Sequence, residues 1–172
     1  MCIPTCRRMA RTDKRASLLG PIDWTRELVA FRIRGTRAGG KSDQTLLCGV
    51  DSGEGVEPIW IGIDGDSGRL LVRLVPLSGH GWQVWKGPRL AANASFDLEV
   101  ALHPHMGPGG VLLRADETSA WSTLTSTSSK GCENLKRPQR WAMGHGQSGP
   151  GDRSFTGDLL KVTIARQTPK FD

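Results

Sequence analysis

The sequence predicts an all-β protein, in which residues 21–172 form a single antiparallel two-sheet β-sandwich. Apolar residues recur at every second position from residue 28 onward, which is the period of a strand rather than of a helix. The chain contains 22 Gly and 10 Pro, which interrupt it with turn signals. About nine to eleven short strands follow at the spacing of about 8–12 residues that is typical of sandwiches and barrels.

The first half of the domain holds a strand and a hairpin. Residues 28–34 (LVAFRIR) alternate apolar and polar positions, which indicates a strand with one buried face. Residues 58–75 are predicted to form a hairpin. Apolar residues alternate over 59–63, the turn-forming sequence DGDSG follows at 64–68, and a second strand returns at 69–75.

Residues 81–86 (GWQVWK) are predicted to form the next strand. Trp82 and Val84 share one face of it, and Gln83 and Trp85 share the other. If Trp82 lies in the core, Trp85 is exposed beside a polar group or is covered only by a loop; the other reading is that Trp85 caps one end of the sandwich.

The second half of the domain has its clearest strand at residues 96–102. Apolar side chains on one face alternate there with Asp97 and Glu99 on the other. Short strands are expected at 111–114 and 140–144. A longer strand is expected at 158–166, in which Leu160, Val162 and Ile164 share one face. The Ser/Thr-rich residues 118–135 show a weaker pattern.

Charge is concentrated at the N-terminus. The net charge is +6, and residues 1–20 hold five basic residues and one acid. We expect these residues to be a solvated, flexible extension rather than a nucleic-acid-binding arm. Their charges interrupt any apolar core of a signal peptide. No apolar run approaches the roughly 20 residues that span a bilayer, so no transmembrane segment is expected.

The four cysteines do not form two close pairs. Cys2 and Cys6 are near each other, but Cys48 and Cys132 stand alone, which disfavours a zinc site. A Cys48–Cys132 disulfide and buried thiols remain alternatives.

Three stretches resemble the laminin-G-like, concanavalin A-like lectin/glucanase superfamily. Residues 58–75 are similar to its central hairpin, and residues 96–102 with 111–114 are similar to a strand pair of the family. The third stretch is the closing pattern, in which Phe155 and Gly157 precede the last strand.

The resemblance implies a jelly-roll sandwich of two curved sheets. Members of the superfamily bind glycans on a concave face or at rim loops, sometimes beside a structural calcium, and others are hydrolases or lyases. A secreted or cell-surface location would follow from the family, although this chain shows no signal peptide. The loop acids Asp51, Asp64 and Asp66 are the expected calcium ligands, because calcium takes oxygen ligands from loops.

We therefore expect a non-catalytic carbohydrate-binding or adhesion module. Trp85 is the predicted sugar platform, because an indole stacks on the C–H face of a pyranose, and Gln83, Glu99 and His103 are the expected polar groups. One alternative is a protein-interaction or assembly domain without a sugar ligand.

A glycan hydrolase or lyase is the remaining alternative. Asp97 and Glu99 are the one plausible carboxylate pair for a hydrolase, but no residue is assigned as catalytic. The chain has no Tyr, which excludes a lyase mechanism that needs one. No phosphate-binding glycine motif opens a helix, so nucleotide binding is not expected.

Overall fold

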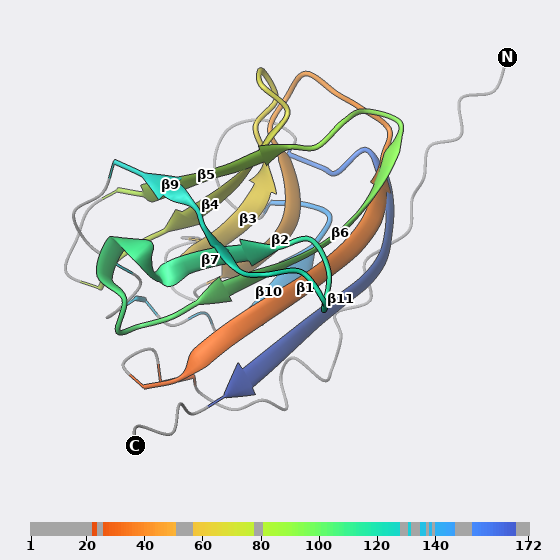
Figure 1. Cartoon of the computed structure of the whole chain (residues 1–172). Helices are drawn as coiled ribbons and strands as arrows, with labels where there is room; N and C mark the ends of the chain where they lie inside the picture. The colour runs from red at the N-terminus through yellow and green to blue at the C-terminus, as the bar shows by residue number, and fades with distance from the viewer. Residues whose placement is uncertain are drawn as a thin grey trace, which may run out of the picture.

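Two antiparallel β-sheets pack face to face (Figure 1). The computed structural model describes residues 22–23, 26–50, 57–77, 81–127, 131, 135–136, 138, 140–146 and 153–167. This part of the chain contains eleven strands and one short 3-10 helix, so the predicted all-β class is confirmed. No helix in it is long and apolar enough to cross a membrane.

The five-stranded sheet has the strand order β11-β1-β6-β7-β8. Its members are β1 (Leu28–Arg37), β6 (Ala94–Leu102), β7 (Val111–Arg114), β8 (Ser122–Thr123) and β11 (Gly157–Gln167). The short helix η1 (Gly107–Gly110) lies between β6 and β7 in the chain.

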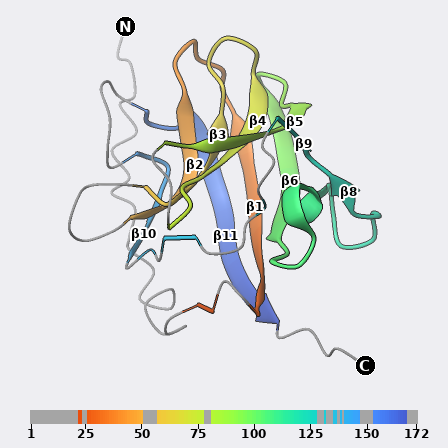
Figure 2. The ribbon, with the colours of Figure 1, turned by 90° about the vertical axis from the view of Figure 1, so that its left-hand side faces the viewer.

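The six-stranded sheet has the strand order β10-β2-β3-β4-β5-β9. Its members are β2 (Gln44–Val50), β3 (Ile59–Ile63), β4 (Arg69–Leu74), β5 (Gln83–Arg89), β9 (Thr125–Ser126) and β10 (Arg140–Met143). Seen from the side, β8, β9 and η1 close one flank of the sandwich, and β10 lies at the other (Figure 2).

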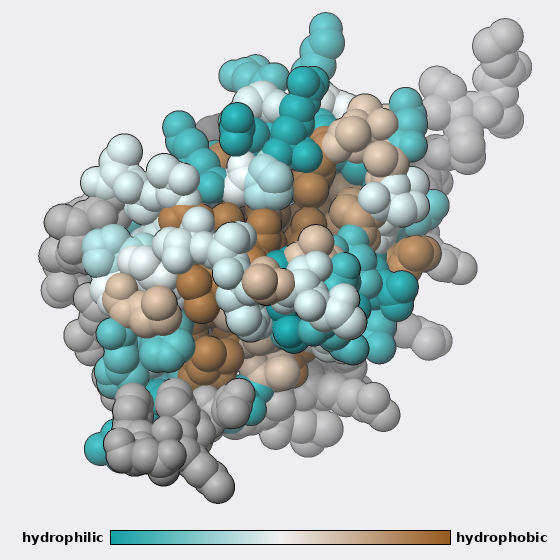
Figure 3. Space-filling model, viewed as in Figure 1, coloured by the Kyte–Doolittle hydropathy of each residue, from teal (hydrophilic) through white to brown (hydrophobic). Residues whose placement is uncertain are grey.

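The core fills the space between the two sheets. The predicted alternation holds in β1, where Val29, Phe31 and Ile33 are fully buried between the layers. The hairpin of β3 and β4 is also confirmed, with Ile59, Ile61 and Ile63 in the same core. Hydrophobic residues show mainly in the middle of the surface in Figure 3, while hydrophilic side chains gather over the loops at its upper end.

Strand β2 was missed by the sequence patterns. All seven of its residues are buried, because its inner side faces the core and its outer side is covered as well. A strand buried on both faces shows no polar alternation, so a search for period two passes over it.

The last strand carries a β-bulge. Gly35 pairs with Leu159 and Arg34 pairs with Lys161, which leaves Leu160 as the extra residue. Leu160 is 72% exposed, whereas Val162 and Ile164 pack against the core. The simple alternation in the sequence placed Leu160 on the face of Val162, and the bulge moves it off that face.

The predicted orientation of β5 is wrong. Trp85 is fully buried and Trp82 is 42% exposed. Trp85 pairs with Val72, whose side chain lies in the core, and its Nε1–H donates to the Pro108 carbonyl oxygen at 2.9 Å. Each face of the strand carries an indole, so alternation alone does not tell which face is inside.

Candidate functional site

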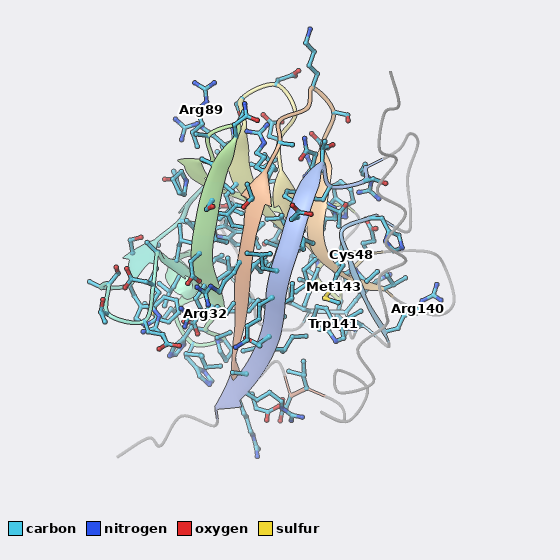
Figure 4. All side chains as sticks on the ribbon, turned by 90° about the vertical axis from the view of Figure 1, so that its right-hand side faces the viewer. Arg32, Cys48, Arg89, Arg140, Trp141 and Met143 are labelled. Carbon is cyan, nitrogen blue, oxygen red and sulfur yellow. The ribbon has the colours of Figure 1, made fainter. Side chains whose placement is uncertain are left out.

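The outer face of the six-stranded sheet carries a second apolar cluster. Its buried members are Cys48, Val50, Trp60 and Leu71, and Val84 and Ala142 pack against them. The cluster starts near β10, where Cys48 pairs with Ala142, while the neighbouring Trp141 and Met143 of β10 pack against the core (Figure 4). A sheet face of a sandwich that points away from the core is normally polar, so this face is distinctive.

A stacked arrangement of two indoles and a guanidinium lies on this face. Arg73 in β4 is directly opposite Trp60 in β3, and both point outward. The Arg73 guanidinium carbon lies 4.3 Å from the centroid of the Trp60 ring and 4.9 Å from that of the Trp82 ring. Trp60 is fully buried, so Trp82 is the ring of this stack that is open to solvent. We call Trp60, Arg73 and Trp82 the Trp82 stack.

Asp43 holds Arg73 in the Trp82 stack. Arg73 Nη2 donates to Asp43 Oδ2 at 2.8 Å. The other carboxylate oxygen, Oδ1, accepts from the Gly65 N–H at 3.1 Å. Asp43 therefore ties the guanidinium to the β3–β4 turn, which restricts the rotamers of a long side chain.

The Trp60 indole lies across Gly62. A Cβ at Gly62 would collide with the Trp60 ring and with the Gln44 carbonyl oxygen. The indole Nε1–H donates to Thr45 Oγ1 at 2.8 Å, which satisfies its buried donor. The missing side chain at Gly62 thus allows the ring to lie flat on the sheet.

A buried ion pair lies near the Trp60 ring. Arg153 Nη2 lies 2.7 Å from Glu57 Oε2, and the Glu57 side chain is fully buried. The Arg153 guanidinium carbon is 6.0 Å from the centroid of the Trp60 ring. Two guanidinium groups, those of Arg73 and Arg153, therefore lie near the Trp60 ring. The Trp82 ring is the part of the Trp82 stack that a ligand can reach.

Further charged groups of both signs lie around the β3–β4 turn and Arg73. Hydrogen bonds from Ser67 lower the pKa of Asp64, and the nearby positive charges of Arg73 and Lys86 act in the same direction. Lys86 is exposed and projects from the same sheet face as Arg73, because it pairs with the outward Leu71. The open Trp82 ring lies beside Arg73, which Asp43 holds, so a stacking surface adjoins hydrogen-bond donors and an acceptor.

The predicted sugar-binding residues do not share a surface. Trp85 and Gln83 point between the two sheets, because Gln83 pairs with the core residue Leu74. Glu99 points outward from the five-stranded sheet, where it pairs with Arg114. His103 follows β6, and its Nδ1 accepts from the His105 N–H. A buried Trp85 does not offer a stacking face, so its expected role is not compatible with this structure.

Asp97 and Glu99 lie on the outer face of the five-stranded sheet, as expected from their alternation. Arg32 Nη2 is 2.9 Å from Asp97 Oδ2, and Arg114 Nη2 is 2.6 Å from Glu99 Oε2. The hydrogen bond from Arg32 holds the pKa of Asp97 below its ordinary value. A general acid of a glycosidase needs a raised pKa, so Asp97 is unsuited to that part. Figure 4 shows Arg32 on this face, beside β1.

The structure describes two of the three predicted calcium ligands, Asp64 and Asp66. Asp51 lies outside the described residues. Asp64 Oδ2 accepts from the Ser67 N–H at 2.9 Å and also from its hydroxyl group, as in a plain hairpin turn. Among the residues that the structure describes, no three His, Cys, Asp or Glu side chains gather into a metal-binding group. Calcium at Asp64 and Asp66 stays a prediction.

Two other predictions also fall partly or wholly outside the described residues. Cys132 is not described, so the alternatives of a Cys48–Cys132 disulfide and buried thiols both stay open. The basic extension at residues 1–20 is not described either.

The loop after β7 gives a pH-dependent prediction. Asp116 Oδ1 accepts from the Thr118 N–H, the Thr118 hydroxyl and the Ser119 N–H, each at 2.8 Å, which lowers the pKa of Asp116 to about 2. Because the folded pKa is depressed, these bonds stabilise the fold fully above the unfolded pKa of about 3.9 and are lost as pH falls toward 2. We expect the Asp116→Asn variant to lose less stability than the parent between pH 4 and pH 2. Urea unfolding at several pH values measures this. An equal loss in both proteins would contradict it.

One signal in the sequence points to the Trp82 stack. The hairpin has an apolar inner face, and its outer face carries Trp60 in β3 and Arg73 in β4. A five-residue turn with strict alternation places these two opposite each other. The contribution of Asp43 carries no such signal, because it comes from a loop outside the hairpin.

Comparisons with solved structures agree with this architecture. The chain is similar to the CBM40 module of the IT-sialidase of Ruminococcus gnavus bound to α2,3-sialyllactose, with a TM-score of 0.55 and 12% identity over 87% of this chain and 80% of that chain. Another structure of that module gives a TM-score of 0.57 and 14% identity over 82% and 77% of the two chains. A provisionally assigned carbohydrate-binding protein of Bacteroides ovatus gives 0.52 and 15% over 80% of this chain and 36% of that chain.

The chain has a concanavalin A-like fold. At these identities, the likeness shows the fold alone. No known protein family matches the sequence, and neither does any curated protein. The concanavalin A-like fold hosts many activities, so the function has to be argued from the site.

Proposed function

We propose that this chain is a non-catalytic carbohydrate-binding module whose ligand lies against Trp82 on the outer face of the six-stranded sheet. The observation that carries the proposal is the 42% exposed indole of Trp82, held by Arg73 at 4.9 Å. An indole ring that is open to solvent presents a flat apolar surface, and the C–H face of a sugar ring stacks on such a surface.

The surroundings of Trp82 suit a hydroxyl-rich ligand. Arg73 supplies donors beside the ring, and its partner Asp43 supplies an acceptor. The comparisons support the same class of ligand, since the Ruminococcus gnavus module, which shares the fold, binds sialyllactose. The arginine-paired state of Asp97 and Glu99 favours binding over hydrolysis.

The test is isothermal titration calorimetry, in which the full chain is titrated with α2,3-sialyllactose, lactose, maltose and cellobiose. We expect Trp82→Ala to weaken binding by about tenfold or more, which corresponds to about 1.4 kcal/mol of lost stacking energy. Leu160→Ala is the matched control, because it removes exposed apolar surface from β11, away from the site.

Two outcomes would count against the proposal. One is a folded wild-type protein that binds none of the four sugars, which would favour the interaction-domain alternative. The other is a Trp82→Ala variant with wild-type affinity.

Repeating the titration with calcium and with a chelator tests the proposed calcium ligands Asp51, Asp64 and Asp66. Affinity that falls with the chelator would support them, and unchanged affinity would remove them.

A further inference from the structure

A second exposed indole lies on the opposite side of the sandwich. Trp121 is 40% exposed, and the Arg114 guanidinium carbon lies 4.5 Å from its ring centroid. Arg114 is in turn held by Glu99, at 2.6 Å. This repeats the pattern at the Trp82 stack, where an exposed Trp rests on an Arg that a carboxylate fixes. We call Trp121, Arg114 and Glu99 the Trp121 stack.

The Trp121 stack belongs to the five-stranded sheet. Val111 and Leu113 of β7 point into the core, so Arg114 points outward, as does its partner Glu99 in β6. Figure 4 views this sheet with β11, β1 and β6 in front, and Arg32 marks its outer surface. Trp82 lies on the outer face of the six-stranded sheet. The two exposed indoles are therefore separated by the thickness of the sandwich, and no single short oligosaccharide reaches both.

The loop that carries Trp121 is held in place by several hydrogen bonds. Arg114 Nη1 donates to the Glu117 carbonyl oxygen at 3.0 Å. Asp116 accepts the three bonds from Thr118 and Ser119 described above, and the Ser122 hydroxyl donates to the Leu113 carbonyl oxygen at 3.1 Å. A ring held in this way loses little conformational freedom when a ligand stacks on it, which favours binding.

Most of the charges around Trp121 compensate each other. Arg114 is paired with Glu99, and the Glu117 carboxylate is paired with Arg32. The Glu117 side chain remains 71% exposed, so it keeps acceptor capacity for a hydroxyl group. Asp116 in the same loop is an ionised carboxylate held by the neutral donors of Thr118 and Ser119, so it adds a negative charge that disfavours an acidic sugar. The arrangement therefore suits a neutral sugar better than a charged one.

We propose that the Trp121 stack is a second carbohydrate site, specific for a neutral hexopyranose, and that the chain is bivalent for glycans. The proposal rests on the proposed function, because it extends sugar binding to another surface. The pyranose ring stacks on the part of the indole that Arg114 leaves open, and the Glu117 carboxylate accepts from a sugar hydroxyl. Two sites on opposite faces allow one molecule to cross-link two glycan chains.

The first test follows the indole N–H resonances of the ¹⁵N-labelled full chain by NMR. Trp82→Phe and Trp121→Phe variants assign the two resonances, and α2,3-sialyllactose, lactose, maltose and cellobiose are the probes at millimolar concentration. We expect the Trp121 resonance to shift with at least one disaccharide, and to do so equally in the Trp82→Ala variant. Calorimetry in the Trp82→Ala background measures the same event without the indole signal, and there we expect Trp121→Ala to weaken binding about tenfold or more and Leu160→Ala to leave it unchanged.

The outcomes separate the two proposals. If the Trp82 resonance shifts and the Trp121 resonance does not move with any of the three disaccharides, the second site alone is overturned. If the Trp121 resonance shifts and the Trp82 resonance does not, the second site is supported, and the placement of the first carbohydrate site at Trp82 is overturned. If neither resonance moves in folded protein, both proposals are wrong.

A cross-linking assay tests bivalency directly. Albumin carrying many copies of the sugars that shift the Trp82 and Trp121 resonances is mixed with the full chain, and turbidity is recorded. We expect the wild-type protein and Leu160→Ala to precipitate the conjugate, and Trp82→Ala and Trp121→Ala each to fail. Precipitation that survives Trp121→Ala would overturn the bivalent arrangement.

Discussion

Replacing Trp85 by alanine is expected to lower the free energy of unfolding by about 3–5 kcal/mol, the range for deleting a large buried aromatic side chain. The Trp85 ring is fully buried in the core between the sheets, and the substitution leaves a cavity there. It also leaves the Pro108 carbonyl oxygen without the indole donor. A loss of this size is a large share of the stability of a domain of this length.

The matched control is Trp82→Ala. Trp82 is 42% exposed and contacts Arg73, so its loss should cost about 1 kcal/mol or less. Urea unfolding followed by far-UV circular dichroism measures both variants. The comparison directly tests which face of β5 is inside. If Trp82→Ala were the more destabilised of the two, the orientation of β5 described here would be wrong.

Breaking the Glu57–Arg153 pair is the second change with a large expected effect. In the Glu57→Gln variant, the Arg153 guanidinium keeps its charge in a place where its side chain is 10% exposed. Removing one partner of a buried pair typically costs about 3–5 kcal/mol, because the remaining charge is desolvated without compensation. Arg153 also lies near Trp60, so we expect sugar binding at the Trp82 stack to weaken in the same variant.

Two further variants make this result interpretable. The double variant Glu57→Gln/Arg153→Met removes both charges and should recover much of the lost stability, since a buried pair replaced by uncharged groups is often nearly neutral. Arg26→Ala breaks an exposed pair with Asp23 at 4.0 Å and should change stability by less than about 0.5 kcal/mol. Thermal unfolding of the four proteins in parallel gives the comparison. A Glu57→Gln variant as stable as Arg26→Ala would contradict the role assigned to the pair.

The candidate site shows where sequence reasoning reached its limit. The pattern in residues 81–86 correctly separated Trp82 and Val84 from Gln83 and Trp85, because alternation follows from the pleat of a single strand. It did not show which pair faces the core, since each face offers one aromatic ring. Burial depends on which side of β4 and β5 the other sheet covers, and that is a property of the assembled sandwich.

The Trp82 stack adds a second example. Trp60 and Arg73 meet because of hairpin register, which a sequence can indicate. Asp43 comes from the loop before β2 and reaches Arg73 only once β2 has paired with β3. The Arg153–Glu57 pair is separated by 96 positions in the chain, and no local pattern connects its members.

The sequence by itself determined the all-β class, the hairpin of β3 and β4, and the alternation of β1 and β6, because each depends on neighbours along one strand or one turn. The tertiary structure decided the rest. It placed β2 where both of its faces are covered, shifted Leu160 off its expected face through a bulge, and turned Trp82 rather than Trp85 toward solvent. These outcomes depend on contacts between segments that are distant in the chain, and hydrophobic alternation within one strand does not contain that information.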